Sequence, residues 1–532
     1  MGQTDDAVLL ETLKLCTKAK DLTWGKRIHA YLVISKIKIP VFFLNIITDM
    51  YGKCGSLVDA RALFYGIHKQ DVVSWNVMMS SYARHGFPET AIELFRQMGS
   101  VGRLPDNITF VGLLDACATI GDLRLGAQAH INLAFSGLKL TNTTANALIN
   151  MYSKCRNMDL ACEVFEKMDD RDVVSWNTIL SGYCINTEAG KVLEVFKEME
   201  QTAVEADCIS YLCVLNACAL LSDIALAKDV HARIKQAGIK SDVVLENALL
   251  HMYSKCGSID IALQIFNEMS FRNVISWTVI IASHSNEGDL ENAIFSFHQM
   301  QCEGVNPNDV TILSILHACS SSRELKRGKQ IHASIVGREL QEEAHVGNAV
   351  VDMYSKCGSL LDASKCFYNM RTHDTVSWNT IVSSYAKHGH GKDALKLVQQ
   401  MKEEGFKLDS VTLASILSAC SCAGLIVEAY SCLKSVEKEN GLVPNSSHYA
   451  CVVDLLARAG LLETADEFYT HIPDEPNLAS WRSLLGACKI HGDPKRAKAV
   501  ANAMLNSQST NFQVLDTISN MHFFLAGNTL NR

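Results

Sequence analysis

The chain repeats itself every 101 residues. Four tryptophans keep this step without an insertion, each inside a Val/Ile-Ser-Trp-Asn/Thr phrase: Trp75, Trp176, Trp277 and Trp378. A second phrase, Met-Tyr-Gly/Ser-Lys-Cys, keeps the same step from Met50 to Met353. An ordinary globular domain has no reason to repeat at a fixed length, whereas every unit of a stacked array must present the same faces to its neighbours. The period therefore predicts one elongated array with contacts only between neighbours.

The cysteine content indicates free thiols. The chain has 19 cysteines, an odd number, and no secretory signal peptide is visible. Nine of the cysteines recur at the 101-residue step and so occupy equivalent, separate places along the array. Because free cysteine packs as a small hydrophobic residue, we expect buried thiols in a reducing compartment.

Charge and hydropathy limit the partners. The net charge is −8. Proteins that bind nucleic acids are usually basic, so this charge counts against a nucleic-acid partner. A local basic stripe matters more than the total charge, so the net charge does not exclude RNA. No apolar run reaches the roughly 18 residues that a membrane span needs, so no membrane partner is expected.

The 101-residue period divides into units of 35, 35 and 31 residues. The units end at a recurring, mostly acidic or amide position, occupied by Asp71, Asp106, Thr141, Asp172, Asp207, Asp242, Asn273, Asn308, Glu343, Asp374 and Asp409. Within 72–106, helical spacing predicts a first helix that carries Trp75 and ends before Gly86, and a second helix from about Pro88 to Met98.

A helical hairpin of 31–35 residues is the module of tetratricopeptide-like arrays. The predicted fold class is therefore all-α, a right-handed superhelical α-solenoid of helix-turn-helix repeats. The first helices are expected to line the concave wall and the second helices the outer wall. No segment has a strand pattern.

Three phrases resemble motifs of the plant pentatricopeptide repeat family, in its PLS subclass. The sequence at 72–76 resembles the opening of P motifs, and residues 146–155 resemble S motifs. Ala116-Cys117 followed by His130 resembles L motifs. The resemblance covers nearly the whole chain as fourteen motifs, in the order L-S and then four times P-L-S.

The resemblance also gives the domain organisation. Residues 1–445 correspond to the PLS repeat array and 446–477 to a final S-type repeat. Residues 478–511 resemble a first E motif, and 512–532 a partial, divergent second E motif. E motifs imply a role in organellar C-to-U RNA editing, with the deaminase supplied in trans as a separate protein.

In this family, one repeat reads one RNA base with its fifth and last residues. Carried onto this chain, the base-reading residues are Asn45, Asp71, Asn76, Asp106, Asn146, Asp172, Asn177, Asp207, Asn247, Asn273, Thr278, Asn308, Asn348, Asp374, Asn379 and Asp409. The L motifs have Leu10, Val111, Leu212 and Leu313 at the fifth position, which cannot hydrogen-bond. The implied footprint is N-U-U-N-U-U-N-C-A-N-U-U-N-N, read 5′ to 3′.

Each of these assignments has a structural alternative. Asp and Asn at the end of a unit are also good N-caps for the next helix. A row of cations at the thirteenth position faces either RNA phosphates or a helix C-terminus: Lys53, Arg84, Lys154, Lys255, Lys356, Lys387 and Arg458. The second residue of the P motifs, Val73 in the first, flanks the base in this family but is core by periodicity alone.

Neither catalysis nor metal binding is indicated. The tryptophans are interpreted as packing residues and not as base-stacking platforms. His29, His130, His231 and His332 are copies of one helical site at separate places, so a shared metal is implausible. A zinc deaminase needs His-x-Glu and a distal Cys-x-x-Cys, and neither pattern occurs in the chain. We expect no catalytic residues, no metal and no cofactor.

The sequence thus predicts a sequence-specific adaptor that binds single-stranded RNA, with editing accessory proteins or a deaminase in trans as further partners. Two alternatives stay open: RNA binding for splicing, processing or stability without editing, and a protein-binding scaffold. The family implies a mitochondrion or a chloroplast. No presequence is visible, so a cytosolic protein or a truncated chain also stays open.

Overall fold

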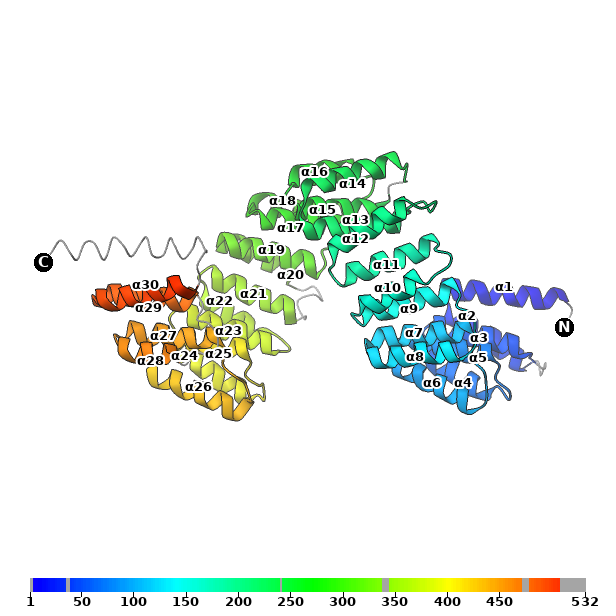
Figure 1. Cartoon of the computed structure of the whole chain (residues 1–532), viewed down its shortest axis with the longest axis horizontal. Coiled ribbons are helices and arrows are strands. Elements are labelled where there is room, and N and C mark those ends of the chain that lie inside the picture. Colours follow the sequence, from blue (N-terminus) through cyan, green and yellow to red (C-terminus); the bar gives the residue numbers. More distant parts are fainter. Residues whose placement is uncertain (1–2, 35–38, 240–241, 337–343, 471–477, 508–532) are drawn as a thin grey trace. The chain divides into compact units, whose positions relative to one another are not determined.

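The computed structural model describes residues 3–34, 39–239, 242–336, 344–470 and 478–507. The chain divides into two compact units, Met1–Phe271 and Arg272–Arg532, which are described separately. All the regular elements in these described ranges are α-helices (Figure 1). The predicted all-α repeat fold is confirmed.

The first unit is a stack of helical hairpins. Its helices are α1 (Gln3–Ala19), α2 (Leu22–Ile34), α3 (Val41–Lys53), α4 (Leu57–Gly66), α5 (Val72–Arg84), α6 (Pro88–Ser100), α7 (Asn107–Ile120), α8 (Leu123–Phe135), α9 (Asn142–Lys154), α10 (Met158–Glu166), α11 (Val173–Ile185), α12 (Ala189–Glu200), α13 (Cys208–Leu221), α14 (Ile224–Gln236), α15 (Val243–Lys255) and α16 (Ile259–Glu268).

The second unit continues the same alternation of first and second helices. Its helices are α17 (Val274–Asn286), α18 (Leu290–Cys302), α19 (Asp309–Ser322), α20 (Leu325–Ile335), α21 (Ala344–Lys356), α22 (Leu360–Asn369), α23 (Thr375–Lys387), α24 (Gly391–Glu403), α25 (Ser410–Ala423), α26 (Ile426–Asn440), α27 (Ser446–Arg458), α28 (Leu462–Thr470), α29 (Leu478–His491) and α30 (Pro494–Ser507).

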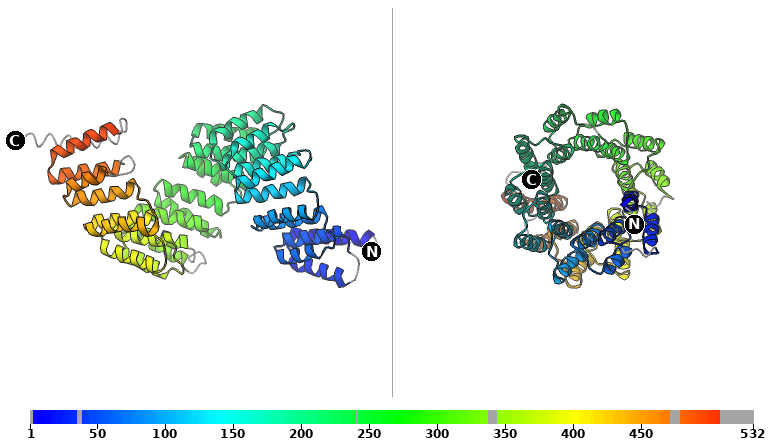
Figure 2. Two further views of the ribbon diagram at one scale, coloured as in Figure 1. Left: turned by 60° about the horizontal axis from the view of Figure 1, so that its bottom comes forward. Right: turned by 90° about the vertical axis from the view of Figure 1, so that its right-hand side faces the viewer.

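Within each unit, a first helix packs against the first helices before and after it and against its own second helix, as α7 does with α5, α9 and α8. The hairpins accordingly lie side by side in both units (Figure 2). This neighbour-only pattern is what the fixed sequence period requires.

The predicted unit ends are the N-caps of the first helices. The residue at the cut accepts a hydrogen bond from a backbone N–H of the next helix wherever the structure describes it: Asp71, Asp106, Thr141, Asp172, Asp207, Asp242, Asn273, Asn308, Asp374 and Asp409. Glu343 lies outside the described residues. Each of these caps satisfies an N–H that would otherwise be unpaired at the helix start.

The different unit lengths arise in the second helix. In the 35-residue units that carry the tryptophan, α6, α18 and α24 have 13 residues each. In the 31-residue units, α4, α16 and α22 have 10 and α10 has 9. The 31-residue unit is therefore a hairpin whose second helix is shorter by about one turn.

The periodic tryptophans are core residues, as predicted. Their exposed fractions lie between 0% for Trp378 and 4% for Trp75. The ring of Trp378 meets that of Phe367 edge to face, with centroids 4.9 Å apart, and Trp75 meets Phe64 in the same way. Aromatic pairs prefer this geometry, so each pair joins a second helix to the first helix of the next repeat.

The periodic histidines are hydrogen-bonded within the repeats. In every period the histidine Nδ1 is 2.8–3.0 Å from the tyrosine hydroxyl of the Met-Tyr phrase, in the pairs His29–Tyr51, His130–Tyr152, His231–Tyr253 and His332–Tyr354. Burial lowers the pKa of all four imidazoles. No cluster of potential metal ligands occurs among the described residues.

The cysteines are free thiols. Of the nine at the 101-residue step, Cys54, Cys155, Cys256 and Cys357 are half-buried. Cys16, Cys117, Cys218, Cys319 and Cys420 are buried. Burial raises the pKa of Cys117 to about 11, so it stays protonated at neutral pH. None of the described helices combines the length and the apolarity that a membrane crossing requires.

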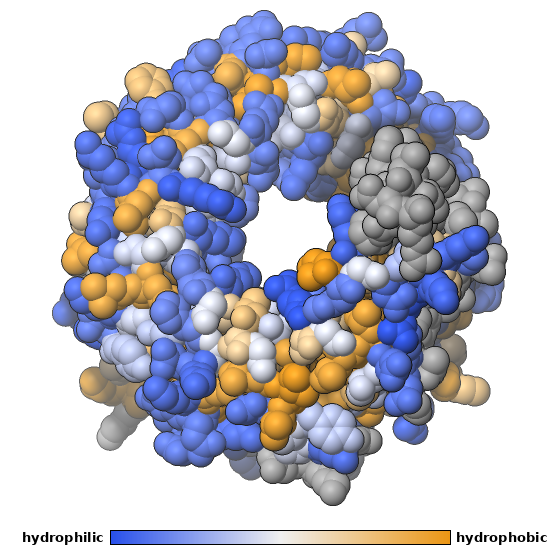
Figure 3. Space-filling view, turned by 90° about the vertical axis from the view of Figure 1, so that its left-hand side faces the viewer, coloured by the Kyte–Doolittle hydropathy of each residue, from blue (hydrophilic) through white to orange (hydrophobic). Residues whose placement is uncertain are grey.

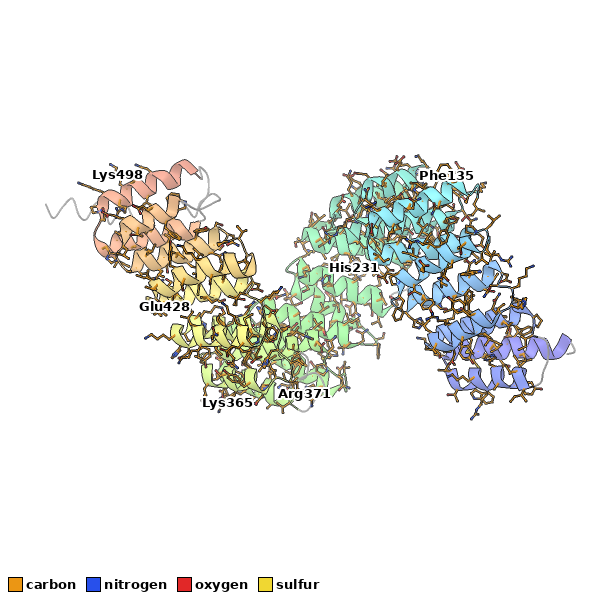
Figure 4. All side chains as sticks on the ribbon, turned by 90° about the horizontal axis from the view of Figure 1, so that it is seen from below. Phe135, His231, Lys365, Arg371, Glu428 and Lys498 are labelled. Carbon is orange, nitrogen blue, oxygen red and sulfur yellow. The ribbon has the colours of Figure 1, made fainter. Side chains whose placement is uncertain are left out.

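The second helices expose polar side chains. Phe135 at the end of α8 is a large apolar exception, with 88% of its surface exposed. Lys365 on α22, Glu428 on α26 and Lys498 on α30 are exposed, and all project from their helices (Figure 4). One end view of the surface is mostly hydrophilic, with scattered hydrophobic side chains (Figure 3).

Replacing Trp378 by alanine is expected to cost about 3–5 kcal/mol of unfolding free energy, because the residue is fully buried against Phe367. Urea unfolding followed by circular dichroism measures the change. Trp24 is 54% exposed, so Trp24→Ala is the matched control and should change stability by less than about 1 kcal/mol. Equal losses for both variants would contradict the assigned core role.

Candidate nucleic-acid interface

The predicted base-reading residues form a hydrogen-bonded group at the junction of two repeats. Asn76 Nδ2 donates to Asp106 Oδ1 at 2.9 Å, although the two residues belong to opposite ends of their motif. The hydroxyl of Thr109, the third residue of the next motif, donates to Asn76 Oδ1 at 2.7 Å. The backbone N–H of Thr109 donates to Asp106 Oδ1 at 2.8 Å. One carboxylate oxygen therefore caps a helix and orients the asparagine.

The same group recurs along both units. Asn45 donates to Asp71 at 3.0 Å, Asn177 to Asp207 at 2.9 Å and Asn379 to Asp409 at 3.1 Å. In each case the Ser or Thr at the third position of the next motif donates its hydroxyl to the asparagine oxygen, at 2.5–2.7 Å. Asn348 donates to Asp374 at 3.3 Å.

Two predicted pairs depart from this arrangement. Asn146 makes no hydrogen bond to Asp172 among the described interactions, and Asn142 Nδ2 donates to Asp172 Oδ2 at 3.4 Å. Thr278 is joined to Thr311 by a 2.6 Å hydroxyl contact, and Thr311 donates to Asn308. 

Asn247 belongs to the first unit and Asn273 to the second. Asn247 is buried in α15, and Asn273 is the N-cap of α17.

The third residue of each motif is a participant that the sequence reading missed. These hydroxyl residues are at most 1% exposed, for example Ser74, Thr109, Ser210 and Thr412. Asp106, Asp207 and four other caps form capping boxes with the third residue of the helix that follows. The recurrent Asp/Asn-x-x-Ser/Thr spacing was visible in the sequence and could have identified them.

The geometry leaves defined atoms for a ligand. Asp106 Oδ1 accepts from Asn76 and Thr109, so the second carboxylate oxygen, Oδ2, and the second N–H of the asparagine amide stay available. Only 7% of the Asn76 surface is exposed. The pair thus presents one acceptor, Asp106 Oδ2, and one donor, the second N–H of Asn76, at a fixed spacing. Most of the Asn76 side chain is buried.

The cap carboxyls are ionised. Burial works to raise the pKa of Asp106, but hydrogen bonds from the Thr109 backbone, the Thr109 hydroxyl and Asn76 outweigh it and lower that pKa. The same balance lowers the pKa of Asp71, Asp207, Asp374 and Asp409. The row of pairs therefore presents carboxylates, which are acceptors only, at neutral pH.

A groove in the first unit brings predicted readers of adjacent repeats together. It has a volume of about 460 Å³ and is lined by α7, α9, α11 and the start of α13. Asn146, Asn177 and Asp207 contribute to its wall. Val111, a fifth residue of an L motif, lines it as well, with no group to donate or accept. Only first helices and their caps line this groove.

Two further grooves use equivalent positions. One, of about 670 Å³, lies between α1 and α3 and includes Leu10, Phe42 and Lys53. The other, of about 420 Å³, lies along α25, α27 and α29 and includes Asp454 and Arg458. The same face of the first helices is therefore hollowed in both units.

The second residues of the P motifs are not core, which corrects the interpretation from periodicity alone. Val73, Val174, Ile275 and Val376 are between 51% and 57% exposed. Val174 lines the groove beside Asn177. These residues precede the fifth residue by three positions, so they lie beside it on one helix face, where an apolar side chain is available to a ligand.

All seven predicted cations are exposed, and each lies in the last turn of a first helix. Their position fits the helix C-terminus interpretation. It also places them on the elements that line the grooves, so the two readings are compatible.

The sequence profile of the PPR repeat family matches residues 70–119, 171–219, 272–321 and 373–422. The PPR repeat profile matches residues 143–173, 247–274 and 348–374. Together these matches cover about half of the chain.

Two similar proteins come from Arabidopsis thaliana. A chloroplastic pentatricopeptide repeat-containing protein is 35% identical over 479 residues, which are 90% of this chain and 55% of that protein. A mitochondrial one is 32% identical over 523 residues, which are 97% of this chain and 75% of that protein. The chain thus spans about half of the first relative and three quarters of the second.

Solved structures share the fold. The crystal structure of the pentatricopeptide repeat protein PPR10 in complex with an 18-nt psaJ RNA element has a TM-score of 0.62 and 17% identity, covering 94% of this chain and 79% of that one. PPR10 from maize crystallised alone has a TM-score of 0.56 and 17% identity, covering 98% and 88%.

Removing a cap carboxylate should destabilise its helix in a pH-dependent way. Asp207→Ala is expected to cost about 1 kcal/mol at pH 7. Because folding lowers the pKa of Asp207, its contribution is present above the usual aspartate pKa and is lost as the pH falls through the lowered value. Hydrogen exchange of the α13 amides at pH 7 and at about pH 3 measures both effects.

Glu198→Ala is the control for Asp207→Ala, because Glu198 is exposed on α12 and makes no ion pair among the described residues. It should leave the exchange of α13 unchanged. A cost of Asp207→Ala that is the same at both pH values would contradict the role assigned to the ionised carboxyl.

Proposed function

The chain belongs to the pentatricopeptide repeat family, and from that premise we propose that it binds single-stranded RNA along the first-helix face and reads bases with the pairs described above. The observation that carries the proposal is the Asn–Asp group with one free donor and one free acceptor, which recurs at repeat junctions in both units. The RNA complex of PPR10, which has the same fold, supports it.

An Asn–Asp pair is suited to uracil. The Watson–Crick edge of uracil has one donor, N3–H, between two carbonyl oxygens. Asp106 Oδ2 can accept from N3–H while the free N–H of Asn76 donates to a carbonyl oxygen. Cytosine has an acceptor at N3, which would face the carboxylate without a proton between them. The pairs at Asn45, Asn76 and Asn177 therefore favour U.

Asparagine in place of the aspartate reverses this preference. An amide such as that of Asn273 can turn an N–H toward N3 of cytosine. Asn308 likewise accepts from Thr311 through Oδ1, which leaves its amide N–H groups for N1 of adenine. The expected footprint remains N-U-U-N-U-U-N-C-A-N-U-U-N-N, with one nucleotide for each motif.

The exposed aliphatic residues at the second positions give each base an apolar support. Val174 and Asn177 line the same groove, so a base bonded to Asn177 would lie against the Val174 side chain. Contact with either face of a base is independent of its sequence. In this proposal the valines hold the bases and the polar pairs select among them.

The biological role that we propose is the choice of a site for C-to-U editing in organelle RNA, with the deaminase supplied in trans. It rests on the resemblance of residues 478–511 to an E motif, of which residues 478–507 form the hairpin of α29 and α30, and on chloroplastic and mitochondrial relatives. The family assignment supports a non-enzymatic role for these repeats.

A binding measurement tests the RNA proposal. A 14-nucleotide RNA with the expected footprint should bind at least ten times more tightly than the same RNA with its U positions changed to A, because each lost pairing costs about 1 kcal/mol or more. Electrophoretic mobility shift at fixed salt gives both affinities. Equal binding of both RNAs would reject base reading, and no binding of either would reject RNA as the partner in favour of a protein-binding scaffold.

A single substitution should change the base that one repeat prefers. Asp106→Asn keeps the N-cap, because Asn caps helices as well as Asp does, but replaces an acceptor by a donor. We expect the variant to prefer C over U at the third nucleotide of the footprint by about tenfold, the reverse of the native chain. Competition between the two RNAs measures this, and an unchanged preference for U would contradict the proposed reading.

Transcript sequencing separates editing from other RNA functions. Plants that lack the gene should fail to convert C to U at one organelle site a few nucleotides 3′ of the footprint. Altered splicing or transcript ends with normal editing would instead support processing or stability as the function.

A further inference from the structure

The seven cations at the thirteenth positions fall into two groups. Three of them form an ion pair with an aspartate four residues earlier, on the same helix. Lys53 lies 2.6 Å from Asp49, Lys356 2.7 Å from Asp352, and Arg458 2.8 Å from Asp454. In these repeats the positive charge is already compensated within the helix.

The other four cations have no ion pair among the described residues. They are Arg84, Lys154, Lys255 and Lys387. The residue four positions earlier is in no case an acid: it is Ser80, Asn150, His251 and Ser383. Burial and the neighbouring Lys255 both lower the pKa of His251, so that side chain is neutral at pH 7. The ninth residue of each of these motifs thus decides whether the cation at the thirteenth is compensated.

The ninth residue also lies on the face of the first helices that lines the grooves. Asp49 lines the groove between α1 and α3 together with Lys53. Asp454 lines the groove along α25 and α27 together with Arg458. Asn150 lines the groove that contains Asn146 and Asn177. A carboxylate at this position lies beside the cation on the surface that an RNA backbone would approach, and an uncharged residue leaves the cation without an ion pair on its own helix.

We propose that the ninth residue determines which repeats hold the RNA backbone, so that Arg84, Lys154, Lys255 and Lys387 contact phosphates while Asp49, Asp352 and Asp454 screen the cation of their own repeat. This inference rests on the proposed RNA-binding function and refines it. It divides the array into repeats that contribute both base reading and phosphate contact, and repeats that contribute base reading with little net charge.

The magnitudes allow the two groups to be distinguished. Each phosphate that is neutralised on a single strand contributes about 0.7 to the slope of log affinity against log salt. Losing one such contact therefore weakens binding about fivefold at 0.1 M salt. An exposed ion pair at this spacing is weak, so screening is partial, and a compensated lysine should contribute a smaller share of slope and affinity.

The matched variants are Lys255→Ala and Lys356→Ala. Both lysines belong to the same phrase, Met-Tyr-Ser-Lys-Cys, at the ends of the equivalent helices α15 and α21. Lys255 is a better choice than Lys154, because Lys154 lies near Asp115. Burial raises the pKa of Asp115, and the positive charge of Lys154 acts in the opposite direction and lowers it.

Binding of the footprint RNA is measured by fluorescence anisotropy between about 0.05 and 0.3 M salt. Lys255→Ala should lower the salt slope by about 0.7 and the affinity at 0.1 M about fivefold, while Lys356→Ala should change the affinity by about twofold or less.

A reciprocal exchange tests the ninth residue directly. His251→Asp should reduce affinity and slope nearly as much as Lys255→Ala, because it gives Lys255 a carboxylate. Asp352→Asn should raise affinity about twofold, and the gain should disappear when Lys356 is also replaced by alanine. A gain that persists without Lys356 would mean direct repulsion between Asp352 and the RNA and would overturn screening.

Equal effects of Lys255→Ala and Lys356→Ala on the salt slope would also overturn the inference. That result differs from a failure of the proposed function, in which the unaltered chain does not bind the footprint RNA at all. Circular dichroism of each variant shows that the helices remain folded.

Discussion

At the repeat junctions that form an Asn–Asp pair, one carboxylate carries three duties. Asp106 ends one motif, caps the first helix of the next motif and holds Asn76, the asparagine of the proposed reading pair. The first two duties belong to folding, and in the proposed function the third belongs to recognition. Because one oxygen atom serves all of these contacts, the position of the reading group is determined by the same hydrogen bonds that begin the helix. The site is thus as rigid as the scaffold at that point.

Burial supports this rigidity. The hydroxyl residue that joins asparagine and aspartate is at most 1% exposed, as at Thr109 and Thr412. Ser74 joins Asn45 and Asp71 in the same way, and Trp75 beside it packs edge to face on Phe64 of the second helix of the preceding repeat. Buried polar groups cost free energy unless their hydrogen bonds are made, so the network can adopt few alternative arrangements. Adjacent repeats are in this way held together by polar contacts within an apolar core.

Much of the fold could be predicted from the sequence, because the same spacing and turn residues recur in every period and each copy supports the same assignment. The cut residues, the bounds of α5 and α6 and the buried tryptophans all followed from spacing and turn chemistry. The exposure of Val73 and its counterparts could not be derived from periodicity, since an apolar residue at helical spacing is usually core. The resemblance implies a position beside the bound base, and that stays a prediction.

The candidate site was predictable only in part. The family pattern identified Asn76 and Asp106, but a sequence does not show that they bond to each other through Thr109. It also does not show which cations are compensated, because Asp352 and His251 occupy the same position and differ only in what the side chain does once the helix has formed. These properties depend on distances across the helix surface and between repeats, and no short motif encodes them.

The equivalence of Asp and Asn as helix caps has a consequence for how such a chain can evolve. A single nucleotide change converts an aspartate codon into an asparagine codon, and Asn273 and Asn308 already begin helices as Asp106 and Asp207 do. A gene of this kind can therefore accumulate changes of recognition without passing through unfolded intermediates. Under the proposed base reading, new target sequences lie one mutation away, and natural selection can act on recognition while stability stays nearly constant.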